Sequence, residues 1–129
     1  TSQTDIDLNN DVTTDGGMIE LNTLDDVNVA PGVSVDSNTS MSVQAGTINM
    51  ATDAALLSNQ AMNLTTTTGG MTLGRIESLT DLSFTANNQN ILMNGDVDGG
   101  DSFVINAADV TQAAGTRVRA GDTNITATT

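Results

Sequence analysis

The stretch from Met62 to Gly115 reads MNLTTTTGGMTLGRIESLTDLSFTANNQNILMNGDVDGGDSFVINAADVTQAAG. It contains triplets in which two apolar residues flank a polar one, such as Met62-Asn63-Leu64 and Met71-Thr72-Leu73. This alternation has a period of two and is typical of a β-strand with one buried face. Between the triplets stand residues that tolerate the backbone of sharp corners, as in Asn94-Gly95. The stretch therefore predicts short strands joined by tight turns.

Outside this stretch the same triplets continue, and together they form three interleaved series with a shared period of about 21 residues. The triplets of the first series begin at Ile19, Met41, Met62, Leu82, Phe103 and Ile125. Those of the second begin at Ile6, Val27, Ile48, Met71, Ile91 and Val110. The third and weaker series consists of Val12, Val33, Ala55, Ile76, Val97 and Val118.

Three series with one period predict a three-sided coil, an all-β parallel β-helix or β-solenoid. Each turn of about 21 residues contributes three short strands, and about six turns fit the 129 residues. Stacking in register satisfies the backbone hydrogen bonds between turns and aligns the inward side chains into apolar columns. A β-sandwich is the alternative, but it would not need one period through six turns. We expect residues 1–129 to form a single solenoid segment.

The composition excludes several classes of protein. The chain has a net charge of −13, with three arginines, no lysine and no histidine, so it lacks the basic surface of a nucleic-acid-binding protein. It has no cysteine, which excludes disulfides and, with the missing histidine, Cys/His zinc sites and Ser-His-Asp or Cys-His catalysis. No apolar run is long enough to span a bilayer. We expect the chain not to be an enzyme.

The triplets of Met62–Gly115, such as GGMTLG and DLSFTA between Gly- and Asn-bearing turns, resemble the repeat region of filamentous-haemagglutinin-like bacterial surface exoproteins. The resemblance implies a right-handed parallel β-helix that is exported to the cell surface or the extracellular space. There it would serve as a stalk, an adhesin or a biofilm-matrix fibre, with cell-surface glycans as further partners. Such families share a scaffold rather than a site, so the resemblance transfers no functional residues.

The repeat already runs at Ile6 and still runs at Ile125, and no polar cap or amphipathic helix flanks it. Natural proteins normally cover the strand edges that such ends would expose. Two explanations stay open at this point. The chain is part of a longer solenoid, or copies of it stack end to end into a filament.

One stretch, Asn94–Asp101, is a candidate calcium site. Asp96, Asp98 and Asp101 offer carboxylate oxygens in a glycine-rich loop, which suits the hard Ca²⁺ ion. Val97 belongs to an inward series, however, so Asp96 and Asp98 are expected to flank it and point outward. The calcium hypothesis makes the chain a Ca²⁺-dependent carbohydrate- or cell-binding module, and the alternative is a solvated corner.

Two polar columns also follow from the period. Glu77, Asp98 and Arg119 occupy the same place in successive turns, which predicts an outward charged column in which Arg119 pairs with Asp98. We interpret these charges as structural rather than as the carboxylate pair of a polysaccharide-cleaving enzyme. Asn28 and Asn49 likewise predict a short asparagine ladder.

Overall fold

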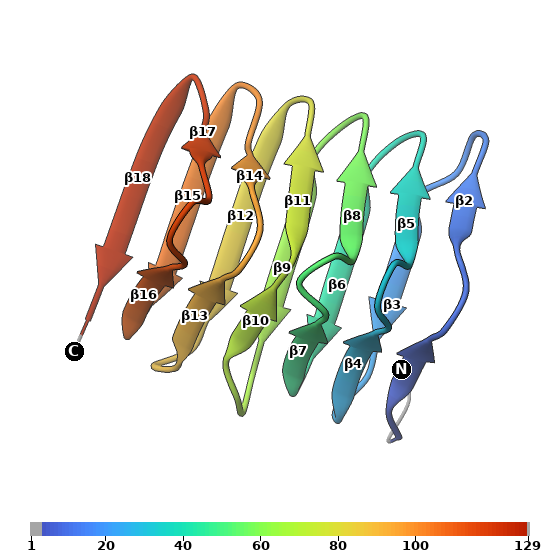
Figure 1. Ribbon diagram of the computed structural model, residues 1–129, viewed down its shortest axis with the longest axis horizontal. Coiled ribbons are helices and arrows are strands. Elements are labelled where there is room, and N and C mark those ends of the chain that lie inside the picture. The colour runs from blue at the N-terminus through green and yellow to red at the C-terminus, as the bar shows by residue number, and fades with distance from the viewer. Residues whose placement is uncertain (1–3, 129) are drawn as a thin grey trace.

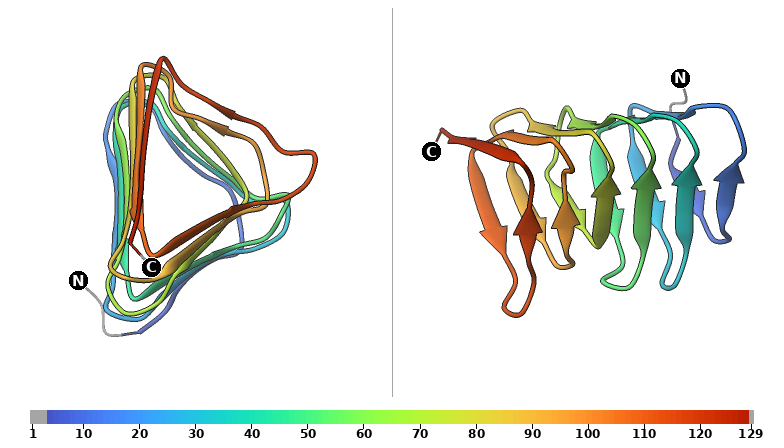
Figure 2. Two further views of the ribbon diagram at one scale, coloured as in Figure 1. Left: turned by 90° about the vertical axis from the view of Figure 1, so that its left-hand side faces the viewer. Right: turned by 90° about the horizontal axis from the view of Figure 1, so that it is seen from above.

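The computed structural model describes residues 4–128, which form a three-sided rod of parallel strands (Figure 1). Seen along its length, the rod has a triangular cross-section with one sheet on each side (Figure 2). Each turn contributes one strand to each sheet, and each sheet has six strands. The predicted β-solenoid, with three strands per turn and six turns, is therefore confirmed. Residues 4–128 contain no helix that is long and apolar enough to cross a membrane.

The three sheets take every third strand in chain order. Sheet 1 consists of β1 (Ile6–Leu8), β4 (Asp26–Val29), β7 (Thr47–Met50), β10 (Met71–Leu73), β13 (Asn90–Met93) and β16 (Asp109–Gln112). Sheet 2 consists of β2 (Val12–Thr14), β5 (Ser34–Ser37), β8 (Ala55–Ser58), β11 (Arg75–Ser78), β14 (Val97–Asp98) and β17 (Val118–Arg119). Sheet 3 consists of β3 (Ile19–Asn22), β6 (Met41–Ala45), β9 (Met62–Thr66), β12 (Asp81–Ala86), β15 (Ser102–Ala107) and β18 (Asp122–Ala127).

The second predicted series is confirmed in full, because its six members pair with one another through sheet 1, from Ile6 to Val110. The third series is wrong at two members. Val35 and Leu56 pair in the inward column of sheet 2, in place of Val33 and Ala55. Val33 is buried in the corner just before β5. Ala55 pairs with Ser34 and with Arg75, one residue out of phase with the inward column.

The last member of the first series is also wrong. Phe103 pairs with Thr123 rather than with Ile125, and Ile125 instead pairs with Ile105. Strands β15 and β18 are six residues long, so each has room for more than one inward apolar position. The triplet pattern aligned Ile125, the second inward position of β18, with Phe103, the first inward position of β15.

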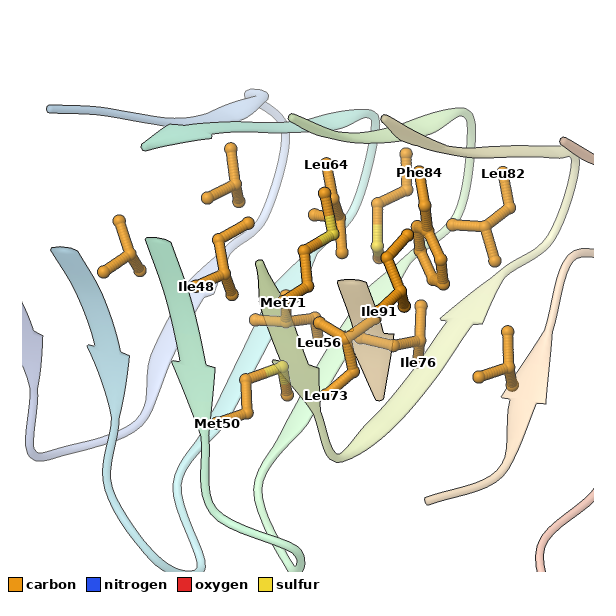
Figure 3. Close-up of a cluster of buried hydrophobic side chains, with 14 of the residues drawn as sticks. Ile48, Met50, Leu56, Leu64, Met71, Leu73, Ile76, Leu82, Phe84 and Ile91 are labelled. Atoms are coloured by element: carbon orange, nitrogen blue, oxygen red, sulfur yellow. The ribbon is translucent and has the colours of Figure 1, made fainter. Parts of the chain in front are cut away.

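Buried apolar side chains fill the triangle and continue from turn to turn (Figure 3). Ile48, Met71 and Ile91 come from sheet 1, and they pack with residues of the other two sheets, such as Leu56 and Leu64. Each fully buried side chain of this size contributes about 1.5–3 kcal/mol relative to its exposed state. Because each turn buries these side chains mainly against its neighbours, the turns stabilise one another.

Polar ladders run along the rod beside the apolar columns. Asn49 Nδ2 donates to Asn28 Oδ1 at 3.0 Å, and Asn28 Nδ2 donates to Asp7 Oδ1 at 2.8 Å, which confirms the predicted asparagine ladder. A second ladder, not predicted, joins Asn59 Nδ2 to Asn38 Oδ1 at 2.7 Å near the corner after sheet 2. These bonds pair side chains of successive turns and so fix their register.

The outer face of sheet 3 is uncharged at the middle of its strands from β6 onward. Its outward side chains from β6 to β18, two from the middle of each strand, are Ser42, Gln44, Asn63, Thr65, Ser83, Thr85, Val104, Asn106, Asn124 and Thr126. None of them is charged. We call this surface the neutral face.

One buried side-chain hydroxyl in the described part of the chain has no hydrogen-bond partner. Within residues 4–128, the Thr66 hydroxyl is buried and forms no hydrogen bond, and its neighbours in the column are Ala45 and Ala86. We expect Thr66→Val to raise the free energy of unfolding by about 1 kcal/mol, because it removes an unsatisfied hydroxyl and keeps the shape of the side chain. Chemical denaturation followed by circular dichroism measures the change.

The control for this prediction is Thr65→Val. Thr65 lies on the same strand but points outward and is only half-buried, so its substitution should change stability by less than about 0.5 kcal/mol. Equal effects at the two positions would show that the Thr66 hydroxyl carries no penalty.

A charged cluster on the outer face of sheet 2

All three arginines of the chain lie on one face of the rod. Arg75, Arg117 and Arg119 line a shallow depression of about 90 Å³ on the outer face of sheet 2, together with Glu77, Asp96 and Asp98. We call these six side chains the charged cluster. They come from three successive turns, because Glu77 pairs in register with Asp98 and Asp98 with Arg119. The charged column predicted from Glu77, Asp98 and Arg119 is thus confirmed.

The ion pair of the cluster is not the one predicted. Arg75 Nη2 contacts Glu77 Oε2 at 2.6 Å, two residues along the same strand. Arg119 makes no ion pair with Asp98 within the described part of the chain. Asp98 instead accepts a hydrogen bond from the Gly100 N–H at 3.1 Å. Local backbone geometry therefore holds this carboxylate, and Arg119 stays exposed one layer away.

The candidate calcium ligands are placed as follows. Asp96 and Asp98 flank the inward Val97 on sheet 2, as the pattern indicated. Asp96 Oδ1 accepts a hydrogen bond from the backbone N–H of Arg117 at 2.8 Å. Asp101 lies beyond Gly100 at the next corner, where its backbone N–H donates to Thr80 O at 2.7 Å.

The structure does not gather these three carboxylates. Over residues 4–128, no three acidic side chains come together in a way that could hold a metal ion. The calcium hypothesis therefore stays a prediction from the sequence. Calorimetry with and without a chelator tests it, since a bound ion stabilises the folded state and its removal lowers the melting temperature.

The cluster balances charge locally. Its three guanidinium groups and three carboxylates sum to zero, whereas the whole chain carries −13. Both side chains of the ion pair are partly exposed, with 60% of Arg75 and 34% of Glu77 accessible. Ion pairs in such surroundings contribute about 0–1 kcal/mol.

We expect Glu77→Gln to lower the free energy of unfolding by about 0.2–1 kcal/mol relative to Glu20→Gln at low salt. Both substitutions remove one negative charge from an acidic rod, but only the first breaks the contact with Arg75. The difference between the variants should vanish in about 1 M NaCl, because salt screens exposed charges. A difference that persists at high salt would mean that the contact is not mainly electrostatic.

Sequence reasoning missed that the three arginines converge, although the signal was present. Arg75, Asp96 and Arg117 are spaced by one repeat period, and so are Glu77, Asp98 and Arg119. Aligning every charged residue by the period, rather than one column alone, would have assembled the cluster.

Comparison with known proteins finds no matching family model, no matching curated protein and no matching solved structure.

Proposed function

We propose that the chain is a structural segment of an extracellular bacterial fibre or surface exoprotein, a stalk or matrix element rather than an enzyme. The observation that carries this proposal is the set of three unbroken parallel ladders that run the length of the rod. Strands lie across the axis, so the backbone hydrogen bonds between turns point along it. A pull along the rod is shared by three ladders at every interface between turns.

The surfaces support an extended assembly. Ile125 continues the column of Ile105, and its side chain is 52% exposed on the last turn. In this proposal further turns, of the same chain or of another copy, cover that column. Each rod carries a net charge of −13, so separate rods repel one another, and this repulsion keeps them soluble. The adhesive role, with cell-surface glycans as partners, is part of the same proposal.

Electron microscopy of the native material tests the proposal. We expect long thin fibres with an axial repeat of about 4.8 Å, the spacing of stacked strands. Short isolated rods of six layers, about 29 Å long at that spacing, would contradict it and would favour a discrete binding module.

A further inference from the structure

The two ends of the rod present layers of matching architecture. The first turn (residues 4–25) supplies the outermost strands β1, β2 and β3, and the last turn (residues 109–128) supplies the outermost strands β16, β17 and β18 (Figure 1). An outermost strand offers backbone N–H and C=O groups to a further strand. Because the turns stack in register along the rod, that register predicts which residues would meet if the first turn of one copy lay on the last turn of another.

The apolar columns can continue across such a junction. Three pairs of apolar side chains would meet there, Val110 with Ile6, Val118 with Val12, and Ile125 with Leu21. Ile125 is 52% exposed in the single rod, and the other five side chains are only partly buried. The polar Gln112 and Thr123 occupy inward columns in the last turn, and Gln112 already donates its amide to Thr116 O at 2.7 Å. The junction would therefore bury a smaller apolar core than the turns inside the rod.

Hydrogen-bond donors of the last turn share outward columns with carboxylates of the first turn. Thr111 shares its column with Asp7, Arg117 with Asp11, and Asn124 with Glu20. The rod already makes such contacts between its own turns. Asn28 Nδ2 donates to Asp7 Oδ1, and the Ser34 N–H donates to Asp11 Oδ1, both at 2.8 Å. At the junction, each of the three carboxylates would therefore face a donor of the neighbouring copy.

Charge selects the head-to-tail direction. Residues 4–25 carry six acidic side chains and no arginine, whereas residues 109–128 carry two acidic side chains and two arginines. Joining two first turns would bring both acidic layers together, and joining either end to its own kind would reverse the strands and break the parallel register. Head to tail, Asp109 meets Asp5 as the one like-charged pair in register. The rod tolerates the same contact between its own turns, where Asp5 Oδ1 accepts the Asp26 N–H at 3.2 Å.

We propose that copies of this chain stack head to tail, with the first turn of one copy on the last turn of the next, so that all three ladders continue across the junction. This inference rests on the proposed fibre function and names a second copy as the partner of each end layer. Arg117 makes the ion pair of the junction. Its backbone N–H is held by Asp96 of its own copy, and its guanidinium group meets the Asp11 carboxylate of the next copy.

The size of the end layer is sufficient for association. Three sides of about 20 Å, with side chains that reach about 5 Å beyond the backbone, give roughly 550 Å² in projection. The accessible area of an uneven surface exceeds its projection, so the junction is of the same order as the about 800 Å² per partner of a standard stable interface. The backbone hydrogen bonds of three ladders add to this contact.

Disulfide trapping tests the junction, since the chain has no cysteine of its own. Asn22 and Thr126 are the first and last members of one outward column of sheet 3. Within one copy they lie five layers apart, about 24 Å, but across the junction they become neighbours at about 4.8 Å, a Cα separation that a disulfide spans. Under mild oxidation we expect the Asn22→Cys/Thr126→Cys double variant to form covalent dimers, trimers and longer chains on a non-reducing gel.

The matched control is Asn22→Cys/Asn106→Cys. Asn106 is exposed in the same column one turn earlier, so in the stack it lies about 9.6 Å from Asn22 of the next copy, which is beyond the reach of a disulfide. Its linked species should form at least tenfold more slowly, after correction for thiol accessibility with a monofunctional maleimide. Equal rates would overturn the stacking but leave the fibre proposal intact, because microscopy tests that separately and a fibre can also consist of one long solenoid chain.

A charge reversal tests the contact of Arg117. Adding Arg117→Glu to Asn22→Cys/Thr126→Cys sets two carboxylates against each other at the junction, and the linking rate should fall by about tenfold. Arg75→Glu makes the same change of charge in the same column, two turns away from the end layer, and should change the rate by less than about twofold. Equal losses for the two variants would overturn the assigned contact between Arg117 and Asp11.

Discussion

Phe84→Ala is expected to lower the free energy of unfolding by about 3–5 kcal/mol, the cost of removing a fully buried aromatic side chain. Phe84 in β12 is completely inaccessible to solvent. Its ring meets Phe103 of the next turn edge to face, with centroids 4.9 Å apart and an interplanar angle of 79°. Such pairs contribute about 0.5–1.5 kcal/mol beyond burial. The strands on both sides of β12 are held in register, so they cannot collapse into the cavity.

Urea denaturation followed by far-ultraviolet circular dichroism measures the loss, because the chain contains no Trp or Tyr to serve as a fluorescence probe. Leu79→Ala is the control. Leu79 is 54% exposed at a corner, and its truncation should cost less than about 0.5 kcal/mol. A loss below about 1 kcal/mol for Phe84→Ala would show that the centre of the triangle is loosely packed.

The fold could be predicted from the sequence wherever a triplet is bounded by corner residues. Met71-Thr72-Leu73 stands between Gly70 and Gly74, so its phase is fixed, and sheet 1 was predicted without error. The predicted inward position is wrong in Ala54-Ala55-Leu56-Leu57. All four residues of this run are apolar, so the alternation of apolar and polar residues cannot identify which of them points inward. There, the corner at Ala54 places Leu56 inward, because the Ala54 N–H closes a turn to Ala51 O.

The surfaces were harder to predict for a different reason. Triplets mark the inward positions, and they understate the length of the strands on sheet 3. Strand β12 runs over six residues, from Asp81 to Ala86, so Thr85 forms a second outward column beside Ser83. The neutral face depends on that second column. The Arg75–Glu77 contact depends on side-chain rotamers, which the period does not determine.

The second large effect is expected at Gly100, where Gly100→Ala should lower the free energy of unfolding by roughly 2–5 kcal/mol. Gly100 adopts φ +61°, which L side chains rarely adopt, and a Cβ there would lie 2.5 Å from the carbonyl carbon and oxygen of Leu79. The obstacle is backbone of the preceding turn rather than the end of a flexible side chain. Relief requires the two turns to move apart, which would strain the ladder between β12 and β15.

Two other glycines separate the contributions to this cost. Gly115 has φ +82° but nothing within 4 Å of an added Cβ, so Gly115→Ala should cost only the backbone strain of about 1–2 kcal/mol. Gly16 has no positive φ and no atom within 4 Å of an added Cβ. Gly16→Ala should therefore be neutral or stabilise the fold by up to about 1 kcal/mol. Thermal denaturation of the three variants should rank them in this order. If Gly100→Ala were no worse than Gly115→Ala, the spacing between turns would be adjustable, and a rod with adjustable spacing would stretch under load rather than transmit it.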